Sequence, residues 1–370
     1  MSGPSIAELV RTQRVIVLCG PGGVGKTTTS ASIGLAAAQA GRRVLVLTID
    51  PARRLADALG LPLSSPAPRP VPADRLRALG LDVGVAKGSL DAWMLDPKVV
   101  FERVVRVLGT PAQAEKILST RLFSHMSELA AGMLEYTAGE ALYSFVESGK
   151  YDLIVLDTPP SRNALDFLDA PARLSSFLED GILKVFTPGE GAGFLASAGR
   201  AVTSVFGRVF GDGFMSDLET FFGAFGGLFG GMRKHSDGVA ALLASSATSF
   251  LLVTSPDADA HREAEFFRGE LARRKLPFAG FVLNRSLARL TSWSHPAELE
   301  ADSPVMRSAL DKLAQIASKE RGLAYEHASL LAELREVAGA TAIAVASPML
   351  LDPSDPLAGL VTLAKSLGES

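Results

Sequence analysis

Short runs of consecutive apolar residues recur along the 370-residue chain. The clearest runs are residues 15–19 (VIVLC), 44–49 (VLVLTI), 153–156 (LIVL), 250–255 (FLLVTS), 280–284 (GFVLN) and 342–347 (AIAVAS). Strands that are apolar on both faces are typical of a parallel sheet with helices on each side. The Ala-rich segment 30–40, which stops at Gly41, predicts a helix between the first two strands. The pattern therefore predicts an α/β fold with a mostly parallel central sheet flanked by helices.

Two long segments do not follow this alternation of strand and helix. Residues 91–150 have a helical period with charged faces, and residues 161–245 contain helical stretches interrupted by Gly and Pro. Since no fixed-period repeat or long polar linker divides the chain, we expect a single domain over residues 1–370. The two segments are expected to form a helical subdomain inserted over the carboxyl edge of the sheet, where such folds bind ligands.

The second of these segments is rich in phenylalanine. Residues spaced by three and four positions there predict one apolar helical face, made of Phe206, Phe210, Phe221, Phe222, Phe225 and Phe229. Interleaved glycines weaken such a helix by about 1 kcal/mol each at interior positions. The face is interpreted either as the core of the subdomain or as the lining of a groove for an apolar client helix. Few basic residues accompany it, so at most a transient membrane contact is expected.

The overall composition excludes several classes of function. Lys and Arg total 37 against 40 Asp and Glu, and the net charge of −3 gives no general attraction to nucleic acid or anionic lipid. The only cysteine, Cys19, lies in an apolar run, which excludes a disulfide framework and an all-thiolate metal site within one chain. The N-terminus lacks the apolar core of a signal peptide. We therefore expect a cytoplasmic protein without a nucleic-acid partner.

The stretch GPGGVGKTTTS, residues 20–30, satisfies both a dinucleotide fingerprint and a phosphate-loop (P-loop) pattern. Lys26 and Thr27 favour the P-loop, because a triphosphate needs a cation and a hydroxyl for Mg²⁺ directly after the glycines. Asp157, which ends the apolar strand in YDLIVLDTPPS, supplies the carboxylate expected near the Mg²⁺. No Asn-Lys-x-Asp motif follows GFVLN, so ATP is favoured over GTP.

The motifs at 22–60, 151–171, 253–271 and 280–284 resemble, in order and spacing, the deviant P-loop ATPases of the arsenite-pump and Get types. The Get-type factors target tail-anchored membrane proteins. The resemblance implies a P-loop NTPase fold that binds ATP or ADP with Mg²⁺. It implies that the phosphate loop consists of Gly22, Gly23, Val24, Gly25, Lys26, Thr27 and Thr28.

The resemblance also implies roles for acids and for residues near the nucleoside. Asp50 matches the switch I aspartate that orients the attacking water beside the metal, with Lys26 as the second catalytic residue. Asp157 opens switch II at residues 157–166, and the metal-side residues are Thr27, Asp157 and Asp50. The nucleotide-side positions are Asp257, Asn284 and Pro348. Each residue also has a purely structural interpretation. Asp50 and Asp157 could cap turns, Asp257 could cap a helix, and Asn284 could be an ordinary strand-end residue.

Two features depart from the family pattern. Pro21 stands where the deviant loop normally carries a second lysine, which reaches across a dimer to the partner's nucleotide. A partner subunit supplies the cation, or an arginine such as Arg53 or Arg54 substitutes, or hydrolysis is slow. The segment after Asn284 has no Cys-x-x-Cys pair, so a zinc-linked dimer is excluded and no zinc is expected. Arsenite activation is not expected either, because it requires several thiolates.

Together these observations predict a dimeric ATPase switch, built from identical or paralogous subunits. Its nucleotide state would open and close the hydrophobic helical subdomain, which would bind or target a hydrophobic membrane-protein client. Two alternatives remain open. One is a spatial-positioning ATPase of the ParA/MinD type, and the other is a weakly hydrolysing ATP-binding subunit of a heteromeric complex.

Overall fold

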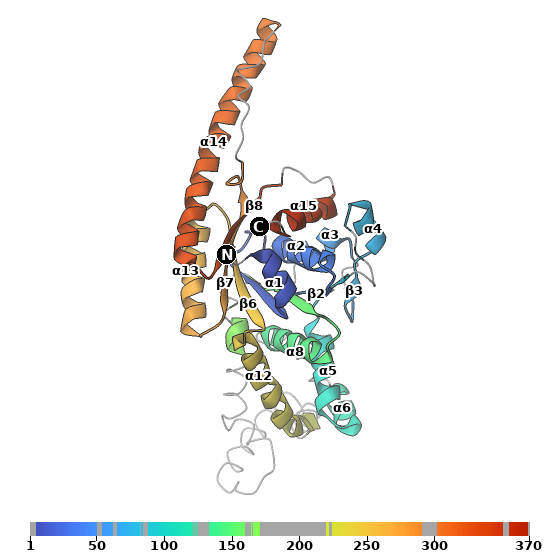
Figure 1. Ribbon diagram of the computed structural model, residues 1–370. Helices are drawn as coiled ribbons and strands as arrows, with labels where there is room; N and C mark the ends of the chain where they lie inside the picture. The colour runs from blue at the N-terminus through green and yellow to red at the C-terminus, as the bar shows by residue number, and fades with distance from the viewer. Residues whose placement is uncertain are drawn as a thin grey trace, which may run out of the picture. The chain divides into compact units, whose positions relative to one another are not determined.

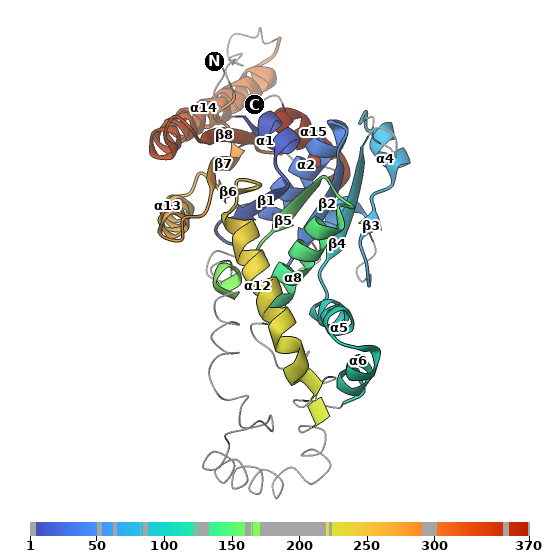
Figure 2. The same ribbon diagram turned by 60° about the horizontal axis from the view of Figure 1, so that its bottom comes forward.

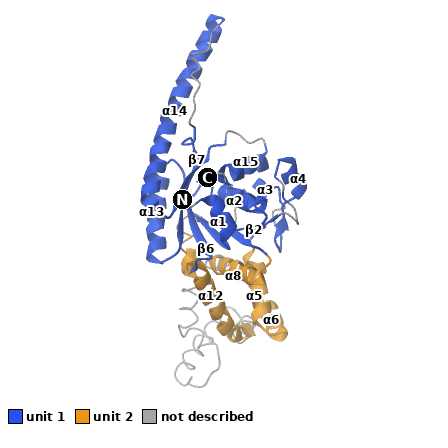
Figure 3. Cartoon of the chain, in the orientation of Figure 1, with its two compact units in different colours: residues 1–94, 151–161, 245–370 blue, residues 95–150, 162–244 orange. Residues whose placement is uncertain are grey.

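The computed structural model describes residues 5–49, 54–61, 65–81, 83, 88–120, 123, 133–159, 164, 166–170, 220–221, 224–290, 302–350 and 355–368. The chain divides into two compact units (Figure 3). Unit 1 comprises residues 1–94, 151–161 and 245–370, and unit 2 comprises residues 95–150 and 162–244. Within the described ranges, no helix combines the length and the apolar character needed to cross a lipid bilayer.

Unit 1 contains an eight-stranded sheet with the order β3-β4-β2-β5-β1-β6-β7-β8 (Figure 2). The strands are β1 (Val15–Cys19), β2 (Arg43–Thr48), β3 (Arg69–Pro70), β4 (Ser89–Met94), β5 (Leu153–Asp157), β6 (Thr248–Thr254), β7 (Phe278–Ser286) and β8 (Ile343–Pro348). All neighbouring strands run parallel except β3, which pairs antiparallel with β4. The predicted α/β fold with a mostly parallel sheet is confirmed.

The helices of unit 1 cover this sheet (Figure 1). They are α1 (Ile6–Thr12), α2 (Lys26–Gln39), α3 (Arg54–Leu59), α4 (Ala73–Ala78), α13 (Ala258–Arg273), α14 (Pro304–Ala338) and α15 (Pro356–Gly368). Helices α1, α2, α3 and α15 share one apolar core with the strands, whereas α13 contacts β6 and β7, and α14 contacts β7 and β8. A Cβ atom at Gly34 would meet Val46, so α2 lies very close to the central strands. This close packing fixes the start of α2 relative to the strand ends.

Unit 2 is helical in its described part. Its elements are α5 (Pro97–Leu108), α6 (Pro111–Leu118), α8 (Met133–Ser148), the short 3₁₀-helix η2 (Gly226–Leu228) and α12 (Phe229–Ala244). Helix α8 packs against both α5 and α12. The expectation that helical structure starts at residue 91 is wrong, because 91–94 belong to β4 and α5 begins at Pro97. Trp93 and Ala92 are buried in the sheet, which favours a strand there.

The described phenylalanines of unit 2 form part of its interior. Phe221 and Phe225 are 1% and 7% exposed, and their rings stack with centroids 5.1 Å apart. Phe225 also lies 5.3 Å from Phe229 and 5.9 Å from Phe101. Of the other predicted face residues, Phe206, Phe210 and Phe222 lie outside the described residues. In this structure Phe221 and Phe225 are therefore core residues of unit 2.

Candidate nucleotide-binding site

The loop between β1 and α2 packs closely against β6 and β7. Gly20 has φ 147°, and a Cβ atom there would overlap the carbonyl oxygen of Val253 in β6. Gly25 has φ 91°, and a Cβ atom there would overlap the side-chain amide of Asn284 in β7. Both positions therefore require glycine, for the backbone conformation and for the close approach.

The N-terminus of α2 faces the loop without a capping side chain. Gly25 is the N-cap residue, and the helix starts at Lys26 and continues for 14 residues. The first N–H groups of a helix have no partner within the helix, and the helix dipole adds partial positive charge at this end. Such an end is a favourable site for phosphate groups.

Lys26 is a buried cation at the start of α2. Its side chain is 8% exposed, and its Nζ donates hydrogen bonds to the carbonyl oxygens of Gly20 at 3.0 Å and Pro21 at 2.7 Å. A buried ammonium needs such acceptors, because removing it from water is otherwise costly. The loop therefore holds the positive charge where an anion bound by the helix N-terminus would meet it.

Asp157 ends β5 and is completely buried beside Thr27. The Thr27 hydroxyl donates to Asp157 Oδ2 at 2.7 Å, and the Thr48 hydroxyl donates to the same oxygen at 2.9 Å. The parallel register explains this meeting, since Asp157 lies opposite both Leu18 in β1 and Thr48 in β2. The structure thus brings together Thr27 and Asp157, two of the three residues that the sequence assigned to the metal, and it adds Thr48.

A cavity of about 430 Å³ opens over the loop. Its lining consists of Gly22, Gly23, Gly25, Lys26, Thr27, Thr28, Arg54 and Arg285. The volume lies within the usual range for small-molecule sites. The residues present fit a magnesium triphosphate, because backbone N–H groups, an ammonium, a hydroxyl and a carboxylate converge on one place.

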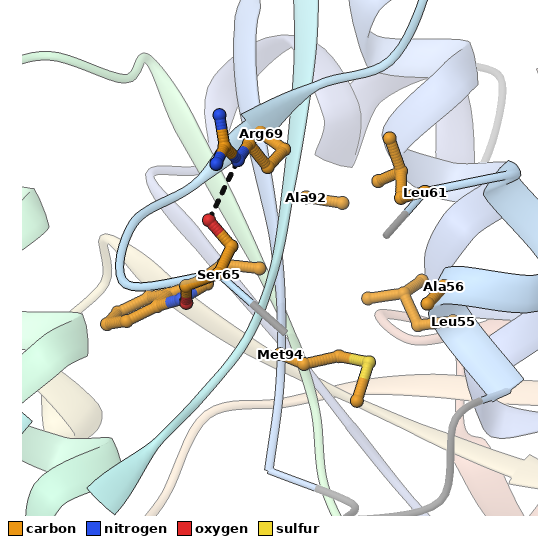
Figure 4. Close-up of a pocket in the computed structure, with 8 residues that line it drawn as sticks. Leu55, Ala56, Leu61, Ser65, Arg69, Ala92 and Met94 are labelled. Carbon is orange, nitrogen blue, oxygen red and sulfur yellow. Dashed lines mark hydrogen bonds between the residues drawn. The ribbon is translucent and has the colours of Figure 1, made fainter. Parts of the chain in front are cut away.

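Arg54 reaches this cavity from the first residue of α3. Leu55, Ala56 and Leu59 of this helix are at most 2% exposed. Behind the helix, residues of α3 and β4 line a small pocket of about 20 Å³, and Arg69 donates to the Ser65 hydroxyl at 2.9 Å along its edge (Figure 4). The buried side of α3 therefore fixes the backbone of Arg54, while its side chain stays exposed.

The remaining predicted residues have other surroundings. Asp257 is the N-cap of α13 and accepts from the N–H groups of Asp259 at 2.8 Å and Ala260 at 3.3 Å. Pro348 ends β8 opposite Ser286. Neither residue belongs to the lining of the cavity. Asp50 lies outside the described residues.

Asn284 contacts the loop directly. Its side chain is 5% exposed, and Nδ2 donates to the carbonyl oxygen of Val24 at 2.8 Å. This bond attaches β7 to the middle of the loop. The sequence reasoning did not single out two residues that lie close by, Thr48 and Arg285. The signal that could have found them was their position at the carboxyl ends of apolar runs, which is where ligands bind in such sheets.

The first strand of this parallel sheet leads through a glycine-rich loop into a helix that starts with Lys26 and Thr27, and Asp157 lies beside them. This arrangement defines a P-loop nucleotide-binding protein. A comparison with known families makes the assignment more specific. The profile of the anion-transporting ATPase family matches residues 13–292, and the chain belongs to this family.

Individual relatives are similar over different shares of their length. A putative arsenical pump-driving ATPase 1 of Aquifex aeolicus is 29% identical over 171 residues, which is 45% of this chain and 40% of that protein. ATPase ASNA1 homolog 1 of Paramecium tetraurelia is 26% identical over 295 residues, 77% of this chain and 79% of that protein. ATPase get3 of Aspergillus terreus is 30% identical over 182 residues, 47% of this chain and 48% of that protein. The matches to the Aquifex and Aspergillus proteins thus span less than half of each relative.

Proposed function

We propose that the protein binds MgATP in the loop cavity and hydrolyses it to ADP and phosphate. The observation that carries this proposal is the 2.7 Å hydrogen bond between Thr27 and Asp157 beside the buried Lys26. These residues supply the hydroxyl, carboxylate and ammonium that a magnesium triphosphate requires at a helix N-terminus. Membership of an ATPase family supports the same reaction.

Each residue has a distinct task in this proposal. The loop N–H groups bind phosphate oxygens, and Lys26 exchanges a carbonyl partner for the γ-phosphate. Thr27 and Asp157 hold the magnesium ion, which when bound supplies a Lewis acid for the phosphate oxygens. A water attacks the γ-phosphorus while the bond to the β–γ bridging oxygen breaks. Asp50 is proposed to orient this water on the strength of the family resemblance alone.

Arg54 is proposed to supply the positive charge that Pro21 does not provide. Its exposed side chain lines the cavity and forms no hydrogen bond or ion pair with the residues that the structure describes. A guanidinium is always charged and binds phosphate oxygens in a bidentate manner. Arg54 is thus the residue proposed to replace the lysine that is missing at position 21. The alternative is a cation from a partner subunit.

Adenine is the proposed base, and Asn284 its proposed recognition residue. Since Nδ2 of Asn284 donates to Val24, the amide oxygen is left to accept a hydrogen bond from the 6-amino group of adenine. Guanine carries a carbonyl at that position, which would face the amide oxygen unfavourably. Asp257, as a helix cap, and Pro348 are proposed to shape the surroundings of the nucleoside without lining the phosphate cavity.

The proposed output is a dimeric switch that acts on a hydrophobic client helix through unit 2. This part of the proposal is supported by the resemblance to Get-type factors and by the phenylalanine-rich composition of unit 2. Because Phe221 and Phe225 are buried here, client binding would require a nucleotide-dependent rearrangement that exposes apolar surface.

Steady-state ATP turnover of the purified chain tests the reaction. Replacing Lys26 by alanine is expected to lower kcat at least 100-fold and to weaken ATP binding. Lys319→Ala, on the exposed side of α14, is the matched control and is expected to turn over normally. Equal ATP affinity in Lys26→Ala and the parent chain would refute the proposed site.

The second candidate function, a scaffold subunit that binds ATP but scarcely hydrolyses it, is favoured by the proline at position 21. Measuring ATP turnover of the parent chain and of Pro21→Lys distinguishes the scaffold from the ATPase. Strong parental turnover eliminates the scaffold. Negligible parental turnover that rises only in Pro21→Lys supports it.

Client handling is tested separately, with a synthetic transmembrane-tail peptide and a scrambled polar peptide as control. Capture of the apolar peptide in only one nucleotide state is the expected result. Capture in no nucleotide state would remove the client from the proposal and leave the ATPase standing.

A further inference from the structure

Arg285 lies at a β-bulge in β7, beside the proposed nucleotide site. Between two paired positions, β7 advances from Leu283 to Ser286 while β8 advances only from Ala346 to Pro348, so β7 carries one extra residue. Arg285 has φ 55°, in the left-handed region that residues other than glycine seldom adopt. Bulges of this kind redirect a side chain and often occur next to functional sites.

The bulge exposes Arg285 between two buried neighbours. Asn284 and Ser286 are 5% and 2% exposed, whereas Arg285 is exposed and lines the loop cavity. Because Asn284 bonds the Val24 carbonyl at 2.8 Å, the distance of this strand end from the loop is fixed. The Arg285 guanidinium forms no hydrogen bond or ion pair within the described part of the chain, so its donors are available to a ligand.

The sheet order places Arg54 and Arg285 on opposite sides of the loop. Strand β1, which leads into the loop, lies between β5 and β6. Asp157 ends β5, and Arg54 follows β2 along the chain, next to β5 in the sheet. Arg285 belongs to β7, beyond β6 on the other side. A nucleotide whose terminal phosphate lies at Thr27 and Asp157 can extend across the loop toward Arg285.

We propose that Arg285 binds the nucleoside end of the nucleotide, with its planar guanidinium stacked on the purine base. This inference rests on the nucleotide site proposed above and names a base-recognition residue within it. Guanidinium groups stack on aromatic faces, and a purine offers a larger face than a pyrimidine. Arg285 thus contributes affinity for the base, and Arg54 acts at the phosphate end.

Calorimetric titration with ADP, CDP and inorganic tripolyphosphate tests this assignment. Arg285→Ala is expected to weaken ADP binding about tenfold, a loss between those of an exposed and a desolvated cation–π contact. Tripolyphosphate, which has no base, is expected to bind as it does to the parent chain. The preference for ADP over CDP is expected to shrink. Unchanged ADP affinity, or an equal loss for tripolyphosphate, would overturn the proposal.

Matched variants separate stacking from charge and from folding. Arg285→Asn tolerates the left-handed backbone and is expected to behave as Arg285→Ala does. Arg285→Lys keeps the charge but not the plane, so full recovery of ADP affinity in this variant would contradict stacking. Arg307→Ala removes an exposed arginine of α14 and is expected to bind every ligand normally.

The same titration distinguishes failure of this inference from failure of the site itself. If the parent chain binds ADP, and Lys26→Ala loses both ADP and tripolyphosphate, the site stands whatever the Arg285 variants do. If ADP does not bind the parent chain, the proposed function fails and the role of Arg285 fails with it.

Discussion

The Lys26 ammonium donates hydrogen bonds to the same glycine-rich loop from which its helix starts. The two carbonyl oxygens that hold its Nζ belong to Gly20 and Pro21, at the beginning of that loop. In the proposed complex, the ammonium would reach a phosphate by a short movement from these carbonyl oxygens. Pro21 contributes through its carbonyl oxygen, a task for which any residue type suffices, so the loss of a lysine side chain leaves the position of Lys26 intact.

Gly20 is expected to be the least replaceable residue of the loop. Gly20→Ala should destabilise unit 1 by about 2–3 kcal/mol, because the new Cβ would overlap the Val253 backbone as well as strain the chain. Gly23→Ala is the matched control, since Gly23 also has positive φ but a Cβ atom there would meet no other atom within 4 Å. Its expected cost is about 1 kcal/mol. Urea unfolding measures both, and equal costs would contradict the packing argument.

The loop residues could be predicted from sequence because their chemistry is local. The Gly-Lys-Thr order alone specifies the turn, the cation and the hydroxyl. For Thr48 and Arg285 the sequence offers only their position at the ends of apolar runs, because their roles depend on which strands are neighbours and on a bulge in β7. The helix-cap interpretation of Asp257 describes its contacts in this structure, and a cap is also a local feature.

At the scale of elements, charged side chains join the first residues of neighbouring strands. Arg43 at the start of β2 donates from its backbone to Asp152 at 2.8 Å and from its guanidinium at 2.6 Å. These hydrogen bonds lower the pKa of Asp152 to about 2. Arg42 donates to the carbonyl oxygens of Val10 and Gln13, so α1 is attached to the same end of the sheet.

Asp152 predicts a pH dependence with a definite sign. Its pKa is lower in the folded chain than its ordinary 3.8, so its contribution to stability is present above that pH and is lost as the pH falls toward 2. The pair is partly exposed, with side chains 52% and 36% accessible, so we expect a contribution of at most about 1 kcal/mol. The stability difference between the parent chain and Asp152→Asn should shrink between about pH 5 and pH 2.5. A constant difference in urea midpoints would contradict this explanation.

A buried polar cluster joins α8 and α12 in unit 2. Glu140, 3% exposed, accepts from the Tyr136 hydroxyl at 3.0 Å and contacts His235 Nδ1 at 3.0 Å. Burial, with the nearby Glu140 charge, raises the pKa of Tyr136, so the phenol stays protonated and donates. One carboxylate thus satisfies groups from both helices.

Removal of that carboxylate should destabilise unit 2. Glu140→Ala is expected to cost about 2–3 kcal/mol, because it leaves Tyr136 and His235 without their acceptor. Glu147→Ala, an exposed acid on the same helix, should cost less than about 0.5 kcal/mol. Thermal unfolding followed by circular dichroism compares them, and similar midpoints for the two variants would refute a role of the cluster.

The long apolar strands could be predicted from sequence because β1, β2, β5 and β6 are buried on both faces over nearly their whole length. Strands β3 and β4 could not, since β4 reads SLDAWM, with a charge in the middle, and β3 has two residues. The charged residue is Asp91, whose carboxylate accepts a hydrogen bond from the Tyr151 hydroxyl at 2.6 Å. Only the tertiary structure brings this donor to the strand.

At the scale of the whole molecule, the described chain divides into two compact units. The loop, the metal-side residues and both cavity arginines belong to unit 1, whereas Phe221 and Phe225 belong to unit 2. The proposed nucleotide site and the phenylalanine cluster of Phe221 and Phe225 therefore belong to different units. A chain of this kind need not unfold in a single two-state step.

Ligand-dependent melting tests this division. ADP with Mg²⁺ at about 100 times its Kd should stabilise unit 1 by about 2.7 kcal/mol, and Lys26→Ala should abolish the shift. Phe225→Ala should cost about 3–5 kcal/mol in unit 2 while unit 1 keeps its ADP shift. Calorimetric scans with and without ADP measure both effects. Loss of the ADP shift in Phe225→Ala would show that the two units do not respond separately.

Cys19 ends β1 and is completely buried, and burial raises the pKa of its thiol to about 12. Because this sulfur is completely buried, alkylating reagents reach it only when the packing around it opens. The sequence holds one cysteine, so every labelled molecule records one such opening. The rate at which iodoacetamide labels Cys19 over hours therefore measures how often the native chain opens at this position, and no engineered probe is needed.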